Sequence, residues 1–362
     1  SKMVQGTVPC TKFSFARVVD CDKINQKAKE NHHAFIVRKL VINTMMKKKK
    51  KIWIVLGSIV ALFAILISIG AILHGTYFQR KRDQIKPYGK IVEVADSFMH
   101  IYSLGEGENT IVLLPGMGVG LPCADFGPLM RKLSEKHTVV CVEYFGIGFS
   151  GSTTVDRTCE NYVEEIRTAL KKAGFEAPYI LMPHSISGVF SEYYASSYPD
   201  EVKAIISLNS TPTHYYGKMP GYIKWALSIA KFQQFTGLPS LLGPATINQK
   251  KLLDYGYTQK ELNDAIIFAG FSINQTLINQ IVNSAEFIKQ VKDLPFPESV
   301  PYMKIISRKT YETPNQQYHM TPQAYQQKHL ERIGKHAQHV ILEGNHFIYM
   351  NNVDRIAEIT DQ

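Results

Sequence analysis

Residues 179–197 read YILMPHSISGVFSEYYASS and place one serine, Ser185, between two segments of different periodicity. The first segment, Tyr179–Met182, is a short apolar run typical of a buried strand, and the second has the spacing of a helix. A nucleophile on a sharp turn from strand to helix needs small neighbours, because the turn crowds backbone against backbone. Pro183 and Ser187 occupy the positions where glycines are commonest in such turns. Ser185 is therefore a candidate nucleophile, and a serine that caps the helix is the alternative.

The chain on both sides of this segment alternates strand-like and helix-like patterns. The further apolar runs are Lys90–Val94, Phe98–Tyr102, Thr110–Leu114, Thr138–Tyr144, Ala204–Leu208, Tyr302–Ile306 and His339–Leu342. Helical patterns between them include Asn161–Ala173 and Val189–Ser197. This alternation predicts an α/β fold with a mostly parallel sheet flanked by helices, in which Lys90–Val94 and Phe98–Tyr102 form an opening hairpin.

The alternation is interrupted between Asn209 and Pro301 by about 90 residues with helical periodicity. Helical patterns cover Tyr222–Phe232, Gln259–Ala269 and Thr276–Gln290. We expect a helical lid over residues 211–295, inserted into a core formed by residues 89–210 and 296–362. Its large apolar side chains either pack small helices onto the core or line a pocket for an acyl chain.

Two further segments carry candidate chemistry at strand ends. The run Leu113–Gly118 closes a strand with a glycine-rich turn, where a backbone N–H can face a developing oxyanion. Near the C-terminus, His346 follows a strand and precedes a terminal helical pattern. A serine and then a histidine, each after a strand, supply the nucleophile and the general base of a hydrolase.

With these segments in place, the chain resembles the α/β-hydrolase fold family over roughly residues 88–360. The resembling stretches are Val112–Gly116, Glu143–Ser150, His184–Gly188 with Tyr194–Pro199, and Glu343–Phe347. The resemblance implies that Ser185 is the nucleophile and His346 the general base. It also implies an oxyanion hole made by the backbone N–H groups of Met117 and Ile186.

The third member of the expected triad is the least clear from the sequence. The family's acid usually follows the strand after the lid, and that strand here runs into Ile306–Glu312. Glu312 is the first acid in reach of the expected position. The alternatives are Asn209, at the end of the preceding strand, which can orient an imidazole but not neutralise it, and Asp293.

A membrane segment is expected upstream of the catalytic core. From Ile52 to Leu73 no residue is charged, and 22 residues of helix are about 33 Å long, enough to cross a bilayer core of roughly 30 Å. A cleaved signal peptide is the alternative, but its apolar core is shorter and ends in small residues at the cleavage site. We therefore expect an uncleaved single-pass anchor.

The basic residues around this segment predict its orientation. Lys47–Lys51 outweigh the three cations of Arg80–Arg82, which places the N-terminus in the cytoplasm and the catalytic domain outside the cell membrane. We expect the basic flank and transmembrane helix at residues 47–75 and a linker at 76–88. Met46 resembles a natural start, so residues 1–46 are interpreted as an N-terminal extension of uncertain origin and are assigned no function.

Charge and cysteine content exclude other classes of protein. The net charge of +10 comes from residues 1–51, and the remaining 311 residues hold 28 basic and 28 acidic side chains. No nucleic-acid partner is expected from a neutral domain of this kind. The five cysteines lack the spacing of a zinc site or a disulfide framework, so no metal and no cofactor are predicted. Residues 146–151 match a dinucleotide-binding motif but open no helix, and His336 and His339 are expected to be solvated surface.

The sequence thus predicts a membrane-anchored serine hydrolase that cleaves a carboxylic ester, with an apolar acyl group and an acyl-enzyme intermediate. Two alternatives remain open. The same residues can cleave amides or short peptides, and a hydrolase fold without a proper acid can serve as a catalytically weak binding module.

Overall fold

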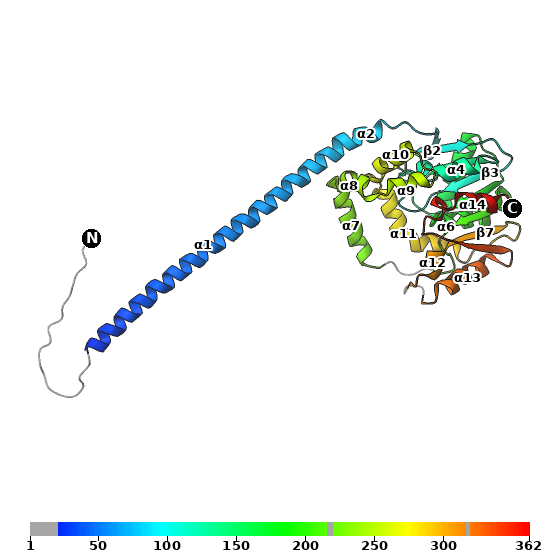
Figure 1. Ribbon diagram of the computed structural model, residues 1–362. Coiled ribbons are helices and arrows are strands. Elements are labelled where there is room, and N and C mark those ends of the chain that lie inside the picture. Colours follow the sequence, from blue (N-terminus) through cyan, green and yellow to red (C-terminus); the bar gives the residue numbers. More distant parts are fainter. Residues whose placement is uncertain (1–20, 216–219, 316–318) are drawn as a thin grey trace. The chain divides into compact units, whose positions relative to one another are not determined.

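The computed structural model of the chain describes residues 21–215, 220–315 and 319–362, and side chains from residue 26 onward. It divides into two compact units between Leu66 and Ile67. Figure 1 shows the long N-terminal helix and the α/β domain. The predicted extension therefore lies outside the described residues as far as residue 20.

The apolar segment is part of a longer helix than the sequence suggested. Helix α1 covers Cys21–Leu73 and continues as the π-helical turn η1 (His74–Phe78) and helix α2 (Gln79–Asp83). Among the described residues, one helix, Gln26–Asp83, is long and apolar enough to cross a membrane. Its most apolar stretch of 18 residues has a mean hydropathy of 2.8, and none of those residues is buried. The helix thus begins well before the charge-free run, in a region where we identified no helical pattern.

The domain is built on one eight-stranded sheet whose strands match the predicted runs. Their order is β1-β2-β4-β3-β5-β6-β7-β8, and β2 alone runs against the other seven. The strands are β1 (Lys90–Val94), β2 (Ser97–Leu104), β3 (Thr110–Leu114), β4 (Thr138–Glu143), β5 (Tyr179–Pro183), β6 (Val202–Leu208), β7 (Tyr302–Ser307) and β8 (Ala337–Leu342). All eight predicted strands are confirmed, and the opening hairpin is the antiparallel edge.

Helices cover both faces of this sheet. Successive side chains of a strand point to opposite faces, so Val112 and Leu114 of β3 enter one apolar core while Ile111 and Leu113 enter the other. The first core is closed by α5 (Cys159–Ala173), α6 (Ser187–Ser197) and α13 (Pro322–Ile333), and the second by α3 (Pro122–Asp125), α4 (Gly127–Leu133) and α14 (Val353–Thr360). Short helices η2 (Pro199–Glu201), α12 (Arg308–Glu312) and η4 (Ile348–Met350) complete the connections.

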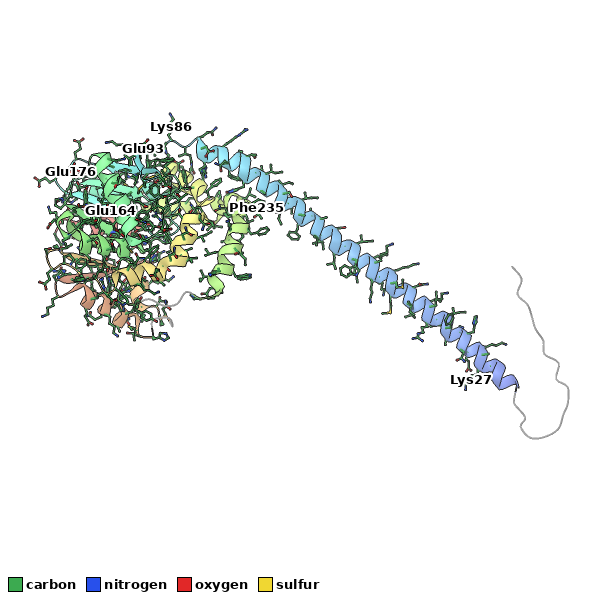
Figure 2. All side chains as sticks on the ribbon, turned by 180° about the vertical axis from the view of Figure 1, so that it is seen from behind. Lys27, Lys86, Glu93, Glu164, Glu176 and Phe235 are labelled. Atoms are coloured by element: carbon green, nitrogen blue, oxygen red, sulfur yellow. The ribbon has the colours of Figure 1, made fainter. Side chains whose placement is uncertain are left out.

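In residues 209–215 and 220–301, which the structure describes, five helices lie between β6 and β7, where the sequence predicted helical periodicity. They are α7 (Tyr222–Phe235), α8 (Leu238–Thr246), α9 (Gln249–Asp254), α10 (Gln259–Ala269) and α11 (Gln275–Val291). We call residues 211–295 the helical insert. In both views α7 lies at the outer edge of the insert (Figures 1 and 2).

A buried group of ionisable side chains connects β7 to α6 and α13. Glu192 of α6 accepts hydrogen bonds from His329 Nε2 at 2.9 Å and from Arg332 Nη1 at 2.9 Å. Lys304 Nζ, which is fully buried, donates to His329 Nδ1 at 2.6 Å. Burial lowers the pKa of Lys304 to about 7, so this lysine is largely neutral in the folded protein above that pH.

This lysine makes stability depend on pH. Between pH 7 and 10.5 the unfolded chain holds the Lys304 proton and the folded chain does not, so stability rises with pH across this window by roughly 1 kcal/mol per pH unit. We expect Lys304→Met to remove that slope in urea denaturation of the full chain at pH 7.5 and 9.5. Lys328→Met, at an exposed position of α13 beside His329, should keep it. Equal slopes in Lys304→Met and the wild type would contradict the assignment.

Candidate active site

The candidate residues come together at the carboxyl ends of neighbouring strands. Ser185 follows β5, Asn209 follows β6, and His346 lies beyond β8. The turn that contains Met117 follows β3, which pairs with β5. In open α/β sheets, this edge is where ligands bind.

Ser185 occupies a strained turn between β5 and α6. Its φ of 56° lies in the left-handed region, which few non-glycine residues adopt. The turn is closed by hydrogen bonds from Ser187 N to His184 O and from Gly188 N to Ser185 O, both 3.1 Å. This geometry presents the Ser185 side chain at the edge of the sheet, as a nucleophile requires.

Ser187 has a role that its size alone did not suggest. Its hydroxyl is fully buried and donates to the carbonyl of Pro115 at 2.5 Å, while Tyr144 Oη lies 2.6 Å away. Ser187 therefore joins the turn after β5 to the turn after β3. No local sequence pattern predicts this bond, apart from the presence of a hydroxyl where glycine is usual.

His346 contacts the nucleophile directly. Its Nε2 lies 2.9 Å from Ser185 Oγ. The His346 carbonyl accepts a hydrogen bond from His184 Nε2 at 3.1 Å, and the two rings lie 4.7 Å apart. Burial lowers the pKa of His346 below 6.5, which keeps the ring neutral at physiological pH, and it lowers the pKa of His184 to about 3. His184 is therefore neutral, and its hydrogen bond to the His346 carbonyl helps to hold His346 in place.

Asn209 is the side chain next to the other nitrogen of this histidine. Its Nδ2 lies 2.7 Å from His346 Nδ1 and 3.0 Å from Thr310 Oγ1. Its Oδ1 accepts a hydrogen bond from the backbone N–H of Ser307 at 3.0 Å, which fixes the orientation of the amide. The NH₂ group therefore faces Nδ1, so Nδ1 accepts and the proton of the neutral ring sits on Nε2.

The acids considered from the sequence lie elsewhere. Glu312 ends α12, is 55% exposed and pairs with Arg308 at 3.0 Å. Asp293 is 79% exposed and pairs with Lys292. Neither makes a hydrogen bond to His346 in the described parts of the chain. The expectation that Glu312 is the triad acid is therefore corrected. Ser307 caps α12 directly after β7, and at the end of this helix Glu312 lies on the surface, paired with Arg308.

The predicted oxyanion donors lie beside Ser185. The N–H groups of Met117 and Ile186 have no hydrogen-bond acceptor among the residues that the structure describes. Gly116 packs so closely that a side chain there would collide with His184 and touch the Cβ of Ser185. Two free N–H groups next to a nucleophile can hold a developing negative charge.

An apolar cavity of about 320 Å³ opens next to Met117, one of these two donors. It is bounded by Met117 on one side, by Phe347 beside His346 on another, and by the helical insert. The insert contributes Ile247, Leu252, Tyr257, Glu261, Leu262, Ala265, Ile266 and Ala269. Its size and lining suit an apolar ligand group.

Asp125 is one of two carboxylates that line this cavity, and Glu261 is the other. Tyr349 Oη donates to its side chain, and Tyr257 Oη donates to its backbone carbonyl at 2.6 Å. Burial raises the pKa of Asp125 to about 6, with the Tyr349 hydrogen bond opposing the shift. Asp125 is thus a polar point in a wall that is otherwise mostly apolar.

A larger cavity, of about 560 Å³, is also lined by the Gly118–Gly120 turn. It is bounded by the loop 146–152, by Phe268 and Phe271 of the insert region, and by Arg82. Ser185 and His346 line neither cavity, but Met117, which carries one of the predicted oxyanion donors, lines the smaller cavity and not the larger one. The smaller cavity is therefore the one that fits the chemistry.

Three buried groups with metal-ligating atoms lie together away from this site. His100, Cys123 and Glu143 have such atoms within 4.8 Å of one another. Glu143 accepts hydrogen bonds from Cys123 N at 3.1 Å and Phe149 N at 2.7 Å, and His100 Nδ1 lies 3.0 Å away. His100 Nε2 accepts from the N–H of Gly89 at 2.8 Å, which leaves the ring proton on the Nδ1 that faces Glu143. The cluster is therefore accounted for by a structural role, because its hydrogen bonds hold the loop 146–151 in place.

The buried cysteines need no other partner to account for them. Cys123, Cys141 and Cys159 are free thiols, and burial raises the pKa of each. They behave as small apolar side chains in the core.

Comparison with known proteins agrees with this architecture. Residues 109–240 match the family model described as alpha/beta hydrolase fold. The chain is 28% identical over 331 residues to the uncharacterized protein YbdG of Bacillus subtilis (strain 168), covering 88% of this chain and 98% of that protein. It is 25% identical to a pimeloyl-[acyl-carrier protein] methyl ester esterase of Shewanella woodyi, over 57% of this chain and 66% of the esterase.

A solved structure extends the likeness over most of the domain. The Cif epoxide hydrolase from Acinetobacter nosocomialis superposes with a TM-score of 0.59 at 16% identity, over 80% of this chain and 95% of that chain. At this identity the likeness concerns the fold alone. Together with the strand order and the family model, it confirms the predicted fold class: the chain has the α/β-hydrolase fold, and hydrolases are among its sequence relatives.

Proposed function

We propose that the chain is a membrane-anchored serine hydrolase that cleaves a carboxylic ester with an apolar acyl group. The observation that carries the proposal is the 2.9 Å contact between Ser185 Oγ and His346 Nε2, next to the free N–H groups of Met117 and Ile186. Nucleophile, base and oxyanion donors are thereby within reach of one substrate carbonyl.

The reaction proceeds through an acyl-enzyme. Ser185 Oγ attacks the ester carbonyl and its proton passes to His346 Nε2, while the carbonyl oxygen becomes an oxyanion held by the two N–H groups. The oxyanion collapses, the ester C–O bond breaks, and the alkoxide takes the proton from His346. Water then repeats the sequence, releasing the carboxylic acid and restoring Ser185.

Asn209 makes proton transfer from Ser185 to His346 less favourable. For His346 Nε2 to accept a proton, the ring must carry its other proton on Nδ1, where it faces the Asn209 NH₂ group at 2.7 Å. The same contact leaves the imidazolium formed after attack without a neutralising carboxylate. An ester is the better substrate on this account, because a leaving alkoxide needs less protonation than a leaving amine, and amide or peptide cleavage is the less favoured alternative.

The acyl group is placed in the 320 Å³ cavity. Met117 lines this cavity and also supplies one oxyanion donor, so an acyl chain attached to the reacting carbonyl can enter it directly. Because α10 forms one wall, we propose that the helical insert acts as a lid over the site. No cofactor or metal is needed for this mechanism.

We further propose that Ile52–Leu73 anchors the protein in the cell membrane as a single span, with the N-terminus in the cytoplasm and the catalytic domain outside. Support comes from the exposed, charge-free run within α1 and from Lys47–Lys51 ahead of it.

A fluorophosphonate probe tests the enzyme assignment. We expect the probe to modify the full-length protein at Ser185, located by peptide mass spectrometry, and Ser185→Ala to lose all labelling. Ser197→Ala, at the exposed end of α6, the helix that follows Ser185, should label like the wild type. A folded wild-type protein that stays unlabelled after prolonged exposure to excess probe would contradict the proposal.

That negative result would favour a second function, a binding module on a hydrolase fold. The observation in its favour is the Asn209 amide at the position of the triad acid. Such a module would bind the apolar ligand in the same cavity without consuming it.

A further inference from the structure

Helix α7 of the helical insert presents an apolar face to solvent. None of its 14 residues is buried. The exposed fractions are 63% for Tyr222, 69% for Trp225, 54% for Phe232 and 61% for Phe235, with Ile229 at 36%. Phe235 projects outward from the helix in Figure 2. We call these five residues the α7 face.

The α7 face is distinct from the side of α7 that packs on the domain. The partly covered positions are Ile223, Leu227, Ala230 and Gln234, spaced four, three and four residues apart. At 100° per residue these positions lie opposite the α7 face. A helix at an ordinary protein surface carries polar residues on its outer side. Here the outer side is the more aromatic of the two, which marks it as a contact surface.

The residues that adjoin α7 indicate what covers this face. Gly70, in the last turn of α1, packs so tightly on Thr236 and Gly237 that a side chain at Gly70 would collide with the Thr236 carbonyl. One turn further, His74 stacks on Phe271 at 4.4 Å and its Nδ1 lies 3.1 Å from Ser240 Oγ. The C-terminal end of α7 is therefore in contact with the end of the charge-free helical run.

We propose that the α7 face lies in the interfacial layer of the lipid bilayer, so that the insert is held at the membrane surface. The inference rests on the proposed anchoring by Ile52–Leu73. Gly70 lies three residues, about 4.5 Å, before the end of that run. A helix that contacts it there is at the depth of an interfacial helix, which buries its apolar face by roughly 5–10 Å.

The composition of α7 fits this position. Tyr222 and Trp225 are the side chains that concentrate where hydrocarbon meets headgroups. Lys224 and Lys231 lie 20° apart around the helix, on one flank of the α7 face, so their stems can follow it while their ammonium groups reach phosphates. Thus a lipid surface satisfies both the aromatic and the basic side chains of α7.

The two tryptophans of the chain, Trp53 and Trp225, provide separate probes of the anchor and of this face. Each is exposed, at 72% and 69%, so replacement by phenylalanine should leave the fold intact. The full-length variants Trp53→Phe and Trp225→Phe are reconstituted into phosphatidylcholine vesicles with either plain or dibrominated acyl chains. Bromine quenches a tryptophan only on contact with the lipid chains.

We expect brominated lipid to reduce the emission of both variants by about half or more. Quenching of Trp53 without quenching of Trp225 would overturn the proposed face and leave the anchor standing. Absence of quenching in both would overturn the anchor and the face together. Emission from Trp225 that is unquenched but depends on protein concentration would also overturn the proposal, because a second copy of the chain would then cover the α7 face.

Discussion

Replacing Asn209 with aspartate is expected to raise kcat/KM for ester hydrolysis by roughly 10²–10⁴-fold. The expectation follows from the hydrogen bonds around this side chain. In the wild type, the Asn209 NH₂ group faces His346 Nδ1 and selects the tautomer with its proton on Nε2. That tautomer cannot accept a proton from Ser185. The reverse change, aspartate to asparagine in a Ser-His-Asp protease, lowers kcat by about 10⁴-fold with its geometry intact.

The surroundings of Asn209 are suited to a carboxylate. The backbone N–H of Ser307 and the hydroxyl of Thr310 lie at 3.0 Å, and His346 Nδ1 lies at 2.7 Å. Each of these groups can donate to a carboxylate oxygen. An aspartate at this position would therefore be fully hydrogen-bonded and would place the imidazole proton on Nδ1, which frees Nε2 to act as the base.

The pH profile supplies a readout that a purely structural effect would not change. Burial alone lowers the pKa of His346 in the wild type. A carboxylate at 2.7 Å would favour the imidazolium and raise that pKa. Asn209→Asp should therefore shift the acidic limb of the kcat/KM profile to higher pH while it raises the plateau.

Hydrolysis of a p-nitrophenyl ester by the full-length protein is the measurement. Adding Ser185→Ala to Asn209→Asp should return the rate to background, which ties the gain to the nucleophile. Asn209→Ala is the matched control, because it removes the amide without adding a charge, and it should stay far below the aspartate variant. A folded Asn209→Asp protein with unchanged activity would show that the amide does not limit the reaction.

The position of Asn209 also shows what the sequence could and could not predict. Ser185 and His346 each follow an apolar strand, so order along the chain and local pattern were enough to identify them as candidates. The triad's third position depends instead on side-chain contacts between strands. The hydrogen bond from Ser307 N orients the Asn209 amide, and no local pattern records it.

The ends of helices were less predictable than the strands, because they too lack a marker in the local sequence. The eight strands are short apolar runs that end at polar turns, and their positions follow from composition. The N-terminal extent of α1 has no such marker, because residues 21–51 carry charges on all sides. Glu312 was favoured by its distance after β7, but the cap formed by Ser307 starts a helix that turns the acid toward Arg308.

A second large effect is expected from filling the 320 Å³ cavity. Ala265 lies on α10 and lines this cavity, so Ala265→Trp places an indole where we propose that the acyl chain binds. A decanoyl ester would then lose the burial of several methylenes. At about 0.8 kcal/mol per methylene, losing four costs about 3 kcal/mol, or roughly 100-fold in kcat/KM.

An acetyl ester reports on the catalytic groups, because its acyl group carries only one methyl beyond the reacting carbonyl. We expect Ala265→Trp to change its hydrolysis by less than about threefold, so that the preference for long chains over acetate falls by roughly 100-fold. Asn263→Trp is the matched control, since residue 263 is exposed on the same helix and does not line the cavity. If decanoyl and acetyl esters lose activity equally in Ala265→Trp, the substitution acts through the fold, and the acyl chain must bind elsewhere.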